Sequence, residues 1–200
     1  VSKTAYDKCV NDPFREIFKL PDYIIKMIDN GWLGQKSKQG FYKKIEKGVI
    51  YSLDFETMEY SPQKKKRYSG IGLARENTSL ESKVKALVNS PDVSGEFTWE
   101  VFSQTLLYSA HLLGEIADDI TSIDSALKWG FGWDRGPFEL WDILGLDNTV
   151  KRMNKERKNI PQWINHMIKR GNRSFYKLIN GKKHYYDLKT SRYIKVDIGD

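Results

Sequence analysis

The chain has 200 residues, of which 40% are hydrophobic, a composition that suits one large domain or two small ones with a sizeable core. It contains no run of 18 apolar residues and opens with VSKTAYDK, which lacks the apolar part of a signal peptide, so a membrane span and secretion by this segment are disfavoured. The net charge is +7, and Cys9 is the only cysteine, which excludes an internal disulfide and a thiolate zinc cluster and favours a reducing, cytoplasmic location.

The first predicted elements are a helix and a hairpin. PDYIIKMIDNG at 21–31 starts with a proline, ends with a glycine and has apolar residues spaced on one helical face, which predicts a helix. The following FYKKIEKGVIYSLDFETMEY is rich in Tyr, Phe, Ile and Val around a central EKG, which predicts a β-hairpin. We expect its aromatic side chains to pack against the helix.

Residues 62–95 are predicted to form a linker with one helix. Thr78 and Glu81 match a capping box ahead of an apolar run, and Pro91 and Gly95 close the segment. The chain is then predicted to be helical, with a long buried helix over 97–119 and shorter helices over 122–130, 137–145 and 147–158. Gly130 and Gly145 are expected to stop two of these helices, and Asp147 to cap the last.

The first helix and hairpin recur at the end of the chain. PQWINHMIKRG at 161–171 matches 21–31 at a constant separation of 140, and the FYK of 41–43 recurs at 175–177. The pattern D-x-x-T-x-x-Y at 54–60 also recurs, whereas most of the loop WLGQKSKQG is missing from the second copy. Internal repeats of this kind are typical of duplicated modules.

The expected fold is therefore mainly α, a tandem pair of units that each end in a small β-hairpin. The units are predicted to be 1–61 and 96–200, on either side of the linker. Because the first unit has far fewer residues ahead of its proline than the second, we expect it to be truncated and the chain to be part of a longer polypeptide.

Most motifs that could carry chemistry fail on closer inspection. GIGLAR at 70–75 and GFGWDRG at 130–136 resemble dinucleotide loops but do not follow a strand. His111 and Glu115 lie one helical turn apart, and two ligands are too few for a metal site. We therefore expect no catalytic, cofactor-binding or metal-binding residue here.

Two segments resemble a known family. GWLGQKSKQGFYKK at 31–44 is similar to the G-x-L-G-x-K-x-G-x-G-F-Y segment in the C-terminal domain of NAD-dependent 3-hydroxyacyl-CoA dehydrogenases. IDSALKWGFGWDRGPFELWDILGL at 123–146 is similar to that family's D-x-A-x-x-x-G-x-G-x-x-x-GPFE-x-x-D-x-x-G signature. With LLYSAHLLGEIADDI ahead of it, the resemblance covers most of residues 10–195.

The resemblance implies a function for the intact protein. It would oxidise (S)-3-hydroxyacyl-CoA to 3-ketoacyl-CoA with NAD, as in fatty-acid β-oxidation, and this chain would form part of the acyl-CoA cleft and of the assembly. The Rossmann domain with the GxGxxG loop and the catalytic His and Glu would precede residue 1, so the 200 residues alone are expected to be inactive. Two copies further resemble the long forms that are often fused to an enoyl-CoA hydratase domain.

The chain also departs from the family pattern. The family's C-terminal-domain Asn, in an F-x-x-N-R motif, is missing from both copies, and Lys38 replaces the usual Gly of the loop. The second unit, which lacks this loop, is expected to support the first as a dimer partner does in single-copy relatives.

Two residues are candidates for substrate binding. Lys36, in the loop of the first copy, is a candidate for a CoA phosphate, and Arg135 for an anionic ligand unless it pairs with Glu139 or Asp142. The remaining candidates are expected to be structural. Gly130, Gly132 and Gly136 let the backbone reverse between two helices, Pro137 starts the second helix, and Trp133 and Phe138 can fill the crevice between the units.

The charge distribution leaves a second function open. Residues 96–150 carry ten acids and two bases, whereas residues 151–200 carry 14 Lys and Arg against four acids. The two segments are expected to neutralise each other as neighbours. The alternative is a non-enzymatic module whose basic, aromatic tail binds nucleic acid.

Overall fold

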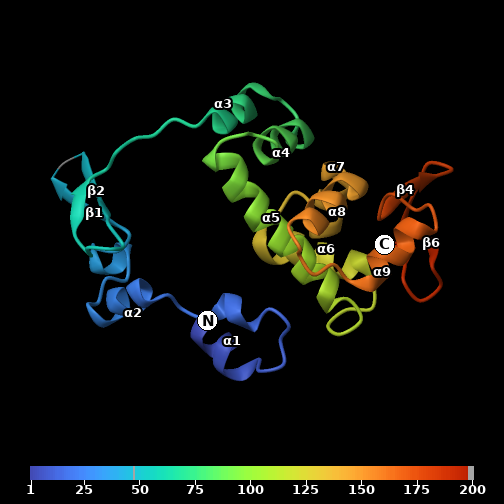
Figure 1. Ribbon diagram of the computed structural model, residues 1–200, viewed down its shortest axis with the longest axis horizontal. Coiled ribbons are helices and arrows are strands. Elements are labelled where there is room, and N and C mark those ends of the chain that lie inside the picture. The colour runs from blue at the N-terminus through green and yellow to red at the C-terminus, as the bar shows by residue number, and fades with distance from the viewer. Residues whose placement is uncertain (47, 198–200) are drawn as a thin grey trace. The chain divides into compact units, whose positions relative to one another are not determined.

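The computed structural model describes residues 1–46 and 48–197, which divide into two compact units, 1–66 and 67–200 (Figure 1). Unit 1 contains two short helices and a three-stranded antiparallel sheet of order β1-β2-β3. Its elements are α1 (Ser2–Lys8), the 3-10 helix η1 (Arg15–Phe18), α2 (Asp22–Asp29), the 3-10 helix η2 (Gln35–Ser37), β1 (Tyr42–Glu46), β2 (Val49–Leu53) and β3 (Tyr60–Pro62).

Unit 2 is a cluster of helices followed by a second antiparallel sheet of order β4-β5-β6. The fold is thus mainly helical with two small sheets, as expected. Its elements are α3 (Ser69–Glu76), α4 (Leu80–Val88), α5 (Val93–Leu112), α6 (Ile120–Phe131), α7 (Pro137–Leu144), α8 (Leu146–Lys155), α9 (Gln162–Lys169), β4 (Tyr176–Ile179), β5 (Lys182–Asp187) and β6 (Arg192–Lys195).

The helix and hairpin predicted at each end are present, with one addition. Helix α2 follows Pro21 and α9 follows Pro161, and Gly31 and Gly171 adopt the positive φ expected just past each helix. Each hairpin gains a third strand, β3 or β6, because the chain turns back once more after the D-x-x-T motif.

Each of the two sheets contains a tyrosine hydrogen bond at the corresponding position. The hydroxyl of Tyr60 donates to the carbonyl of Gly40 at 2.5 Å, and the hydroxyl of Tyr193 donates to the carbonyl of Ser174 at 2.6 Å. Each bond ties the last strand of its sheet to the residues just ahead of the first strand.

Several helix boundaries differ from the prediction. The expected linker contains two helices, α3 and α4, and Ser79 rather than Thr78 caps α4. Helix α5 begins earlier, where the side chain of Asp92 accepts the N–H groups of Ser94 and Gly95, and it ends at Leu112 rather than near 119. The earlier start places Asp92, a favoured N-cap residue, where its carboxylate can accept these N–H groups.

Two further helix ends differ from the prediction. Helix α6 continues through Gly130, and the left-handed Gly132 ends it, because only the later glycine adopts a positive φ. Helix α8 is preceded by Gly145, so Asp147 lies in its first turn and is not its cap. The prediction that Pro137 starts α7 and Gly145 ends it is confirmed.

Helix α7 is the centre of unit 2. It contacts α4, α5, α6, α8 and β4, and its Pro137, Phe138, Leu140 and Trp141 are buried. The indole N–H of Trp141 donates to Thr149 of α8 at 2.6 Å, so even its polar edge is satisfied in the core. The aromatic rings of Phe138, Trp141 and Trp163 surround Phe175 at the head of β4.

A close approach of α6 to the start of α7 requires glycine at position 136. A Cβ there would lie 2.3 Å from the Cβ and 2.4 Å from the Cα of Asp124, so the two backbones could not keep this spacing. At Gly130, by contrast, an added Cβ would meet no atom within 4 Å.

We therefore expect Gly136→Ala to lower the free energy of unfolding of unit 2 by about 2 to 3 kcal/mol through overpacking. The matched Gly130→Ala, in a helix, should be neutral or stabilise by up to about 1 kcal/mol. Urea unfolding followed by tryptophan fluorescence measures both, since all tryptophans except Trp32 lie in unit 2. Equal effects of the two substitutions would contradict the close approach.

Candidate functional site

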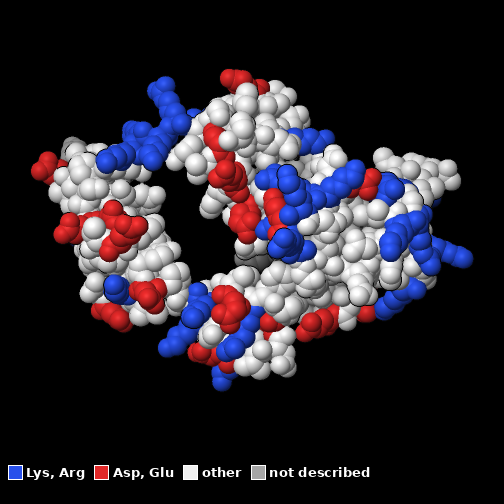
Figure 2. All heavy atoms as spheres, viewed as in Figure 1, with Lys and Arg blue, Asp and Glu red and all other residues white. Residues whose placement is uncertain are grey.

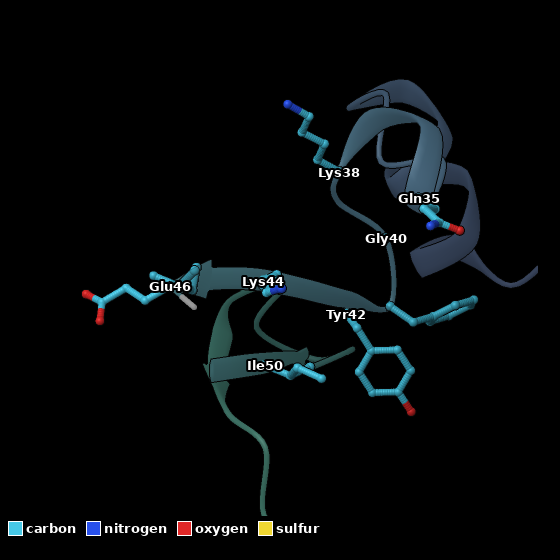
Figure 3. A pocket seen from close by; sticks show the side chains of 10 residues that line it. Gln35, Lys38, Gly40, Tyr42, Lys44, Glu46 and Ile50 are labelled. Atoms are coloured by element: carbon cyan, nitrogen blue, oxygen red, sulfur yellow. The ribbon is translucent and has the colours of Figure 1, made fainter. Parts of the chain in front are cut away.

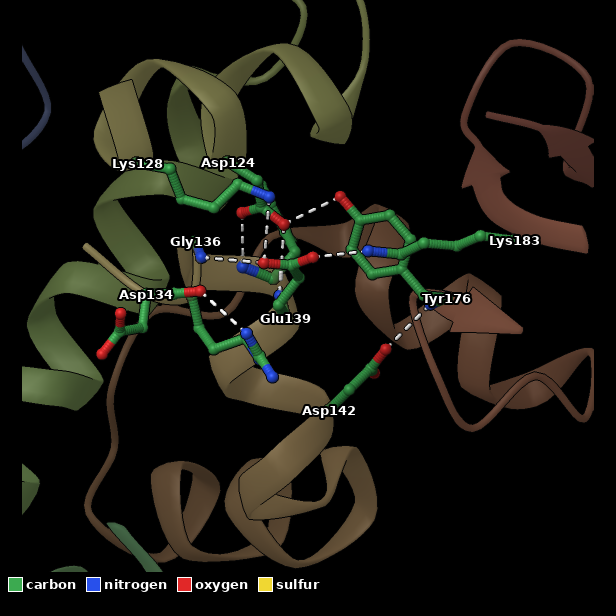
Figure 4. Close-up of polar contacts among 10 residues, drawn as sticks. Asp124, Lys128, Asp134, Gly136, Glu139, Asp142, Tyr176 and Lys183 are labelled. Carbon is green, nitrogen blue, oxygen red and sulfur yellow. Dashed lines mark hydrogen bonds and ion pairs between the residues drawn. The ribbon is translucent and has the colours of Figure 1, made fainter. Parts of the chain in front are cut away.

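The signature segment builds a network of buried carboxylates around the start of α7 (Figure 4). Asp124, on α6, is only 1% exposed. Its Oδ1 accepts the N–H of Phe138 at 2.9 Å, and its Oδ2 accepts the N–H of Glu139 at 3.2 Å and the hydroxyl of Tyr176 at 2.8 Å. One carboxylate from a neighbouring helix therefore satisfies two free N–H groups of the first turn of α7 and holds β4 to it.

Glu139 completes the cap from within α7. Its Oε2 accepts the N–H of Gly136 at 3.1 Å and pairs with Lys128 at 3.2 Å, and its Oε1 pairs with Lys183 of β5. A negative side chain in the first turn also interacts favourably with the helix dipole. Figure 4 shows the Lys183 chain crossing the ring of Tyr176, whose centroid lies 4.2 Å from the ammonium nitrogen.

Asp142 makes the third connection, from α7 to the head of β4. Its Oδ1 accepts the N–H of Phe175 at 2.7 Å and its Oδ2 accepts the N–H of Tyr176 at 2.8 Å. Asp142 thus joins α7 to backbone groups that begin 33 residues further along the chain.

Burial dominates the electrostatics of this network. Desolvation raises the pKa of Asp124 to about 6 and that of Asp142 to about 7, against the opposing effect of the backbone N–H groups that each accepts. The charge of Glu139 adds to the rise at Asp124, and the charge of Asp124 adds to it at Asp142. Glu139 itself has a lowered pKa, because desolvation is outweighed by hydrogen bonds from Lys183 and Gly136.

The observed contacts of these three carboxylates are structural. Each oxygen of Asp124, Glu139 and Asp142 accepts a hydrogen bond from a protein donor, so the three carboxylates connect α6 and α7 to the C-terminal sheet. The described residues contain no group of three His, Cys, Asp or Glu that could hold a metal ion. Helices of the described chain are also too short or too polar to cross a membrane.

The described residues do not fit a nicotinamide dinucleotide. Such cofactors bind where a glycine-rich loop joins a strand to a helix in a parallel sheet, and both sheets here are antiparallel. GFGWDRG instead joins α6 to α7, and the glycines of GIGLAR lie inside α3. Neither glycine-rich segment therefore has the strand–loop–helix setting of a dinucleotide site.

Arg135 lies apart from the network. Its guanidinium donates to the carbonyl of Asp134 at 2.9 Å, and the side chain is exposed, so the expected pairing with Glu139 or Asp142 is wrong. The reason is that Glu139 is already paired with Lys128 and Lys183, and Asp142 already accepts hydrogen bonds from the N–H groups at the head of β4. With Trp133, Arg135 lines a shallow hollow of about 300 Å³ that α4 and α5 close on the other side.

Phe138 does not project from unit 2. It is fully buried and packs on Trp163 and Phe175, which corrects the expectation that it fills a crevice between units. Trp133 is partly exposed, and its assignment to such a crevice stays a prediction.

A second candidate site lies in unit 1, at the loop and sheet of the other family-like segment (Figure 3). The cavity has a volume of about 700 Å³. Its lining residues are Gly34, Gln35, Lys38, Gly40, Phe41, Tyr42, Lys44, Ile45, Glu46 and Ile50. Figure 3 shows Lys38 pointing away from the strands, while Tyr42 and Ile50 lie on the same face of the sheet.

The loop explains a departure noted in the sequence. Lys38 adopts the left-handed conformation, with φ 58° and ψ 10°, so the glycine usual at this position avoids a strain that lysine accepts. Lys36 is exposed in η2 and is not among the cavity's lining residues. Its proposed role at a CoA phosphate stays a prediction.

The acidic and basic segments neutralise each other, as expected. Four ion pairs join an acid of 96–150 to a base of 151–200: Glu100 with Lys158, Asp118 with Lys189, Glu139 with Lys183 and Asp147 with Arg173. Figure 2 shows Lys and Arg gathered over the C-terminal sheet and acidic and basic atoms intermingled on the neighbouring helices.

Fold and site together define a helical domain clamped by carboxylates around a short central helix. Residues 97–180 match the model of the 3-hydroxyacyl-CoA dehydrogenase C-terminal domain. Over 195 residues, 98% of the chain, the sequence is 44% identical to a probable 3-hydroxyacyl-CoA dehydrogenase of Bacillus subtilis. It is 26% identical over 174 residues to a proposed fatty acid oxidation complex trifunctional enzyme of Rickettsia felis.

Residues 97–180 therefore match the C-terminal domain of 3-hydroxyacyl-CoA dehydrogenases, and the chain as a whole is similar to part of such an enzyme. It covers 24% of the Bacillus relative and 22% of the Rickettsia relative, so it spans about a quarter of their length. No solved structure matches the chain. Nothing in these matches supports the alternative of a nucleic-acid-binding module.

The raised pKa values give a test of the network. A carboxyl whose pKa is raised on folding binds protons more tightly in the folded state, so its contribution to stability is complete below its unfolded pKa and is lost as the pH rises through the folded value. We expect the free energy of unfolding of the wild type to exceed that of Asp142→Asn by more at pH 4.5 than at pH 8. Between these pH values the difference should change by about 2 kcal/mol or more.

Urea unfolding at a series of pH values measures this difference. Asp134→Asn is a matched control, since Asp134 is exposed and its carboxylate has no partner in the described residues. A gap between wild type and Asp142→Asn that grows from pH 4.5 to pH 8 would show that the ionised form is the stable one.

Proposed function

We propose that this chain is the substrate-cleft and assembly region of an NAD-dependent 3-hydroxyacyl-CoA dehydrogenase. The intact protein would oxidise (S)-3-hydroxyacyl-CoA to 3-ketoacyl-CoA. The observation that carries the proposal is the 44% identity to the Bacillus relative along 98% of the chain. The carboxylate network also supports the proposal, because the hydrogen bonds of the family-like signature residues hold α6, α7 and β4 together.

We propose that another domain carries out the oxidation step. Removing the hydroxyl proton needs a base beside the substrate, and the carboxylates of Asp124 and Asp142 are instead buried and engaged with backbone N–H groups. NAD and the catalytic base are therefore proposed to be bound by a Rossmann domain N-terminal to this region. The helical units would wall the acyl-CoA cleft and exclude water from it.

The two ends of the chain are proposed to be copies of one module. Supporting observations are the sequence match at a separation of 140, the two sheets of equal strand order and the equivalent hydrogen bonds of Tyr60 and Tyr193. Unit 2, which lacks the loop of η2, would support unit 1 in the assembly. The units proposed from sequence, 1–61 and 96–200, lie within the two compact units.

The wider context follows from the relatives. The trifunctional name of the Rickettsia relatives supports a multifunctional enzyme of fatty-acid metabolism, in which an enoyl-CoA hydratase domain in the same chain is one arrangement. A cytoplasmic location is proposed on the single, unpaired Cys9.

The proposal predicts that the isolated 200 residues are inactive. Purified chain mixed with NAD and a 3-hydroxyacyl-CoA should give no NADH absorbance above the rate without protein, while the protein extended through a Rossmann domain should be active. NADH production by the isolated chain would overturn the division of labour.

The two candidate ligand residues are tested in the extended protein. If Lys36 contacts a CoA phosphate, Lys36→Ala should raise the KM for acyl-CoA several-fold with little change in kcat, since one charge-assisted contact is lost. Lys26→Ala, an exposed lysine of α2, is the control. Arg135→Ala should do the same if it binds an anionic ligand; a change in melting temperature alone would make it structural.

A further inference from the structure

The C-terminal sheet carries a group of bases on one face that the ion pairs of unit 2 do not use. Lys177 on β4 and Lys195 on β6 lie directly across from His184 on the central strand β5. Lys182 lies on the same face of β5, two residues before His184, because side chains alternate between the two faces of a strand. We call these four residues the basic row.

The lysines of the basic row are available to a partner. All three are exposed, and among the described residues none of them forms an ion pair. The ammonium of Lys177 lies 4.1 Å from the centre of the Tyr193 ring, a contact that orients the charge without neutralising it. Asp197 follows the row beyond β6, and no described ion pair joins it to a lysine.

The sheet of unit 1 shows that the architecture does not need these bases. Both sheets have three antiparallel strands, and counted from the Phe-Tyr-Lys that begins each sheet, the equivalent row in unit 1 is Lys43, Tyr51 and Pro62. The first lysine recurs with its ring contact, since Lys43 lies 5.6 Å from the centre of the Tyr60 ring. The other bases have no counterpart. Neighbouring cations repel each other, so a bound anion would relieve a cost that the fold alone does not require.

The tip of the same hairpin is apolar and exposed. Asn180 and Gly181, both with positive φ, form the two-residue turn between β4 and β5. The residues just before this turn, Leu178 and Ile179, are 77% and 39% exposed. The C-terminal sheet lies at the margin of unit 2, and Lys and Arg gather there (Figures 1 and 2). Aliphatic side chains and lysines are thus presented together.

This combination favours one kind of partner. Exposed aliphatic side chains beside a group of lysines suit the surface of an anionic bilayer, where the aliphatic groups enter the interface and the ammonium groups meet lipid phosphates. A nucleic acid gains from free rings beside the bases, whereas Tyr176, Tyr186 and Tyr193 are engaged within the fold. A soluble phosphate compound would use the bases but would leave the apolar tip without a role.

We propose that the β4–β5 hairpin and the basic row bind reversibly to the surface of an anionic lipid bilayer. Leu178 and Ile179 enter the headgroup region, and the three lysines of the row contact lipid phosphates. The sheet lies on the bilayer and does not cross it. This attachment goes beyond the dehydrogenase reaction and does not depend on it.

Co-sedimentation with vesicles measures the binding of the 200-residue chain. With equal amounts of phosphatidylcholine and phosphatidylglycerol, at about 50 mM salt, we expect a dissociation constant on the order of 0.1 mM in accessible lipid. Phosphatidylcholine alone should bind at least about tenfold more weakly, and about 500 mM salt should weaken binding to the anionic vesicles similarly because it screens exposed charges. Equal binding to both kinds of vesicle, or binding to neither, would refute the proposal.

Matched variants separate the basic row from the net charge of the chain. Lys177→Gln and Lys195→Gln should each weaken binding to anionic vesicles roughly fivefold, while Lys177→Arg should bind as the wild type does. Lys43→Gln, the equivalent change in unit 1, should alter binding by less than about twofold. An equal loss for Lys43→Gln and Lys177→Gln would count against the row.

The melting temperature shows whether a lysine of the row serves the fold. Lys195→Gln should melt at the same or a higher temperature than the wild type, since it relieves repulsion. A lower melting temperature would mean that Lys195 stabilises the sheet, which contradicts the proposal.

The single cysteine allows insertion of the tip to be observed directly. A Cys9→Ser, Leu178→Cys chain carries one NBD fluorophore at the tip, and the wild type labelled at the exposed Cys9 is the control. The emission of NBD at position 178 should rise when anionic vesicles are added, and that at Cys9 should not. Unchanged emission at position 178 would rule out insertion.

Single-stranded RNA and coenzyme A are the rival phosphates. Each is titrated into the wild type and into Lys177→Gln, with binding followed by calorimetry. If either binds the wild type, is lost from Lys177→Gln and vesicles do not bind, the row belongs to a soluble phosphate and the lipid surface is the wrong partner. No measurement here depends on NADH production, so the result is independent of the dehydrogenase activity.

Discussion

The acceptance of two α7 N–H groups by Asp124 is the constraint on which unit 2 depends. A helix leaves its first N–H groups without partners inside the helix. In α7 the N–H groups of Phe138 and Glu139 are buried or partly buried, and the carboxylate of Asp124 on α6 accepts both. The reach is short enough that residue 136 must be glycine. Because the same carboxylate accepts the hydroxyl of Tyr176, the spacing of the two helices also fixes where the C-terminal sheet begins.

Burying this many carboxylates is costly, and the surroundings show how the cost is offset. Each oxygen has a donor, and the Lys128 and Lys183 pairs with Glu139 bring positive charge to a segment that is otherwise acidic. The basic C-terminal segment therefore compensates the acidic helices, and its tyrosines pack and donate within the fold. A tail that resembles a nucleic-acid-binding sequence in composition is here an internal counterion.

The sequence predicts the elements well where the signal is local. Proline and glycine at the ends of α2, α7 and α9 mark real boundaries because those residues restrict or extend the backbone on their own. It fails where a boundary depends on a distant or competing partner, as at Asp92, where the carboxylate moves the start of α5, and at Gly130, which the helix passes through. The sequence does not reveal the roles of Asp124 and Tyr176 for the same reason, although an aspartate one helical turn after the buried Ile120 and next to the buried Ile123 is a signal that a buried acceptor is required.

Arg135 and Asp142 lie in the same signature segment but have very different surroundings. Arg135 has no charged partner in the described residues and stays on the surface, while the less conspicuous Asp142 joins α7 to a strand far along the chain. Where acceptors are already filled, as around Phe175, the motif is a completed structural joint.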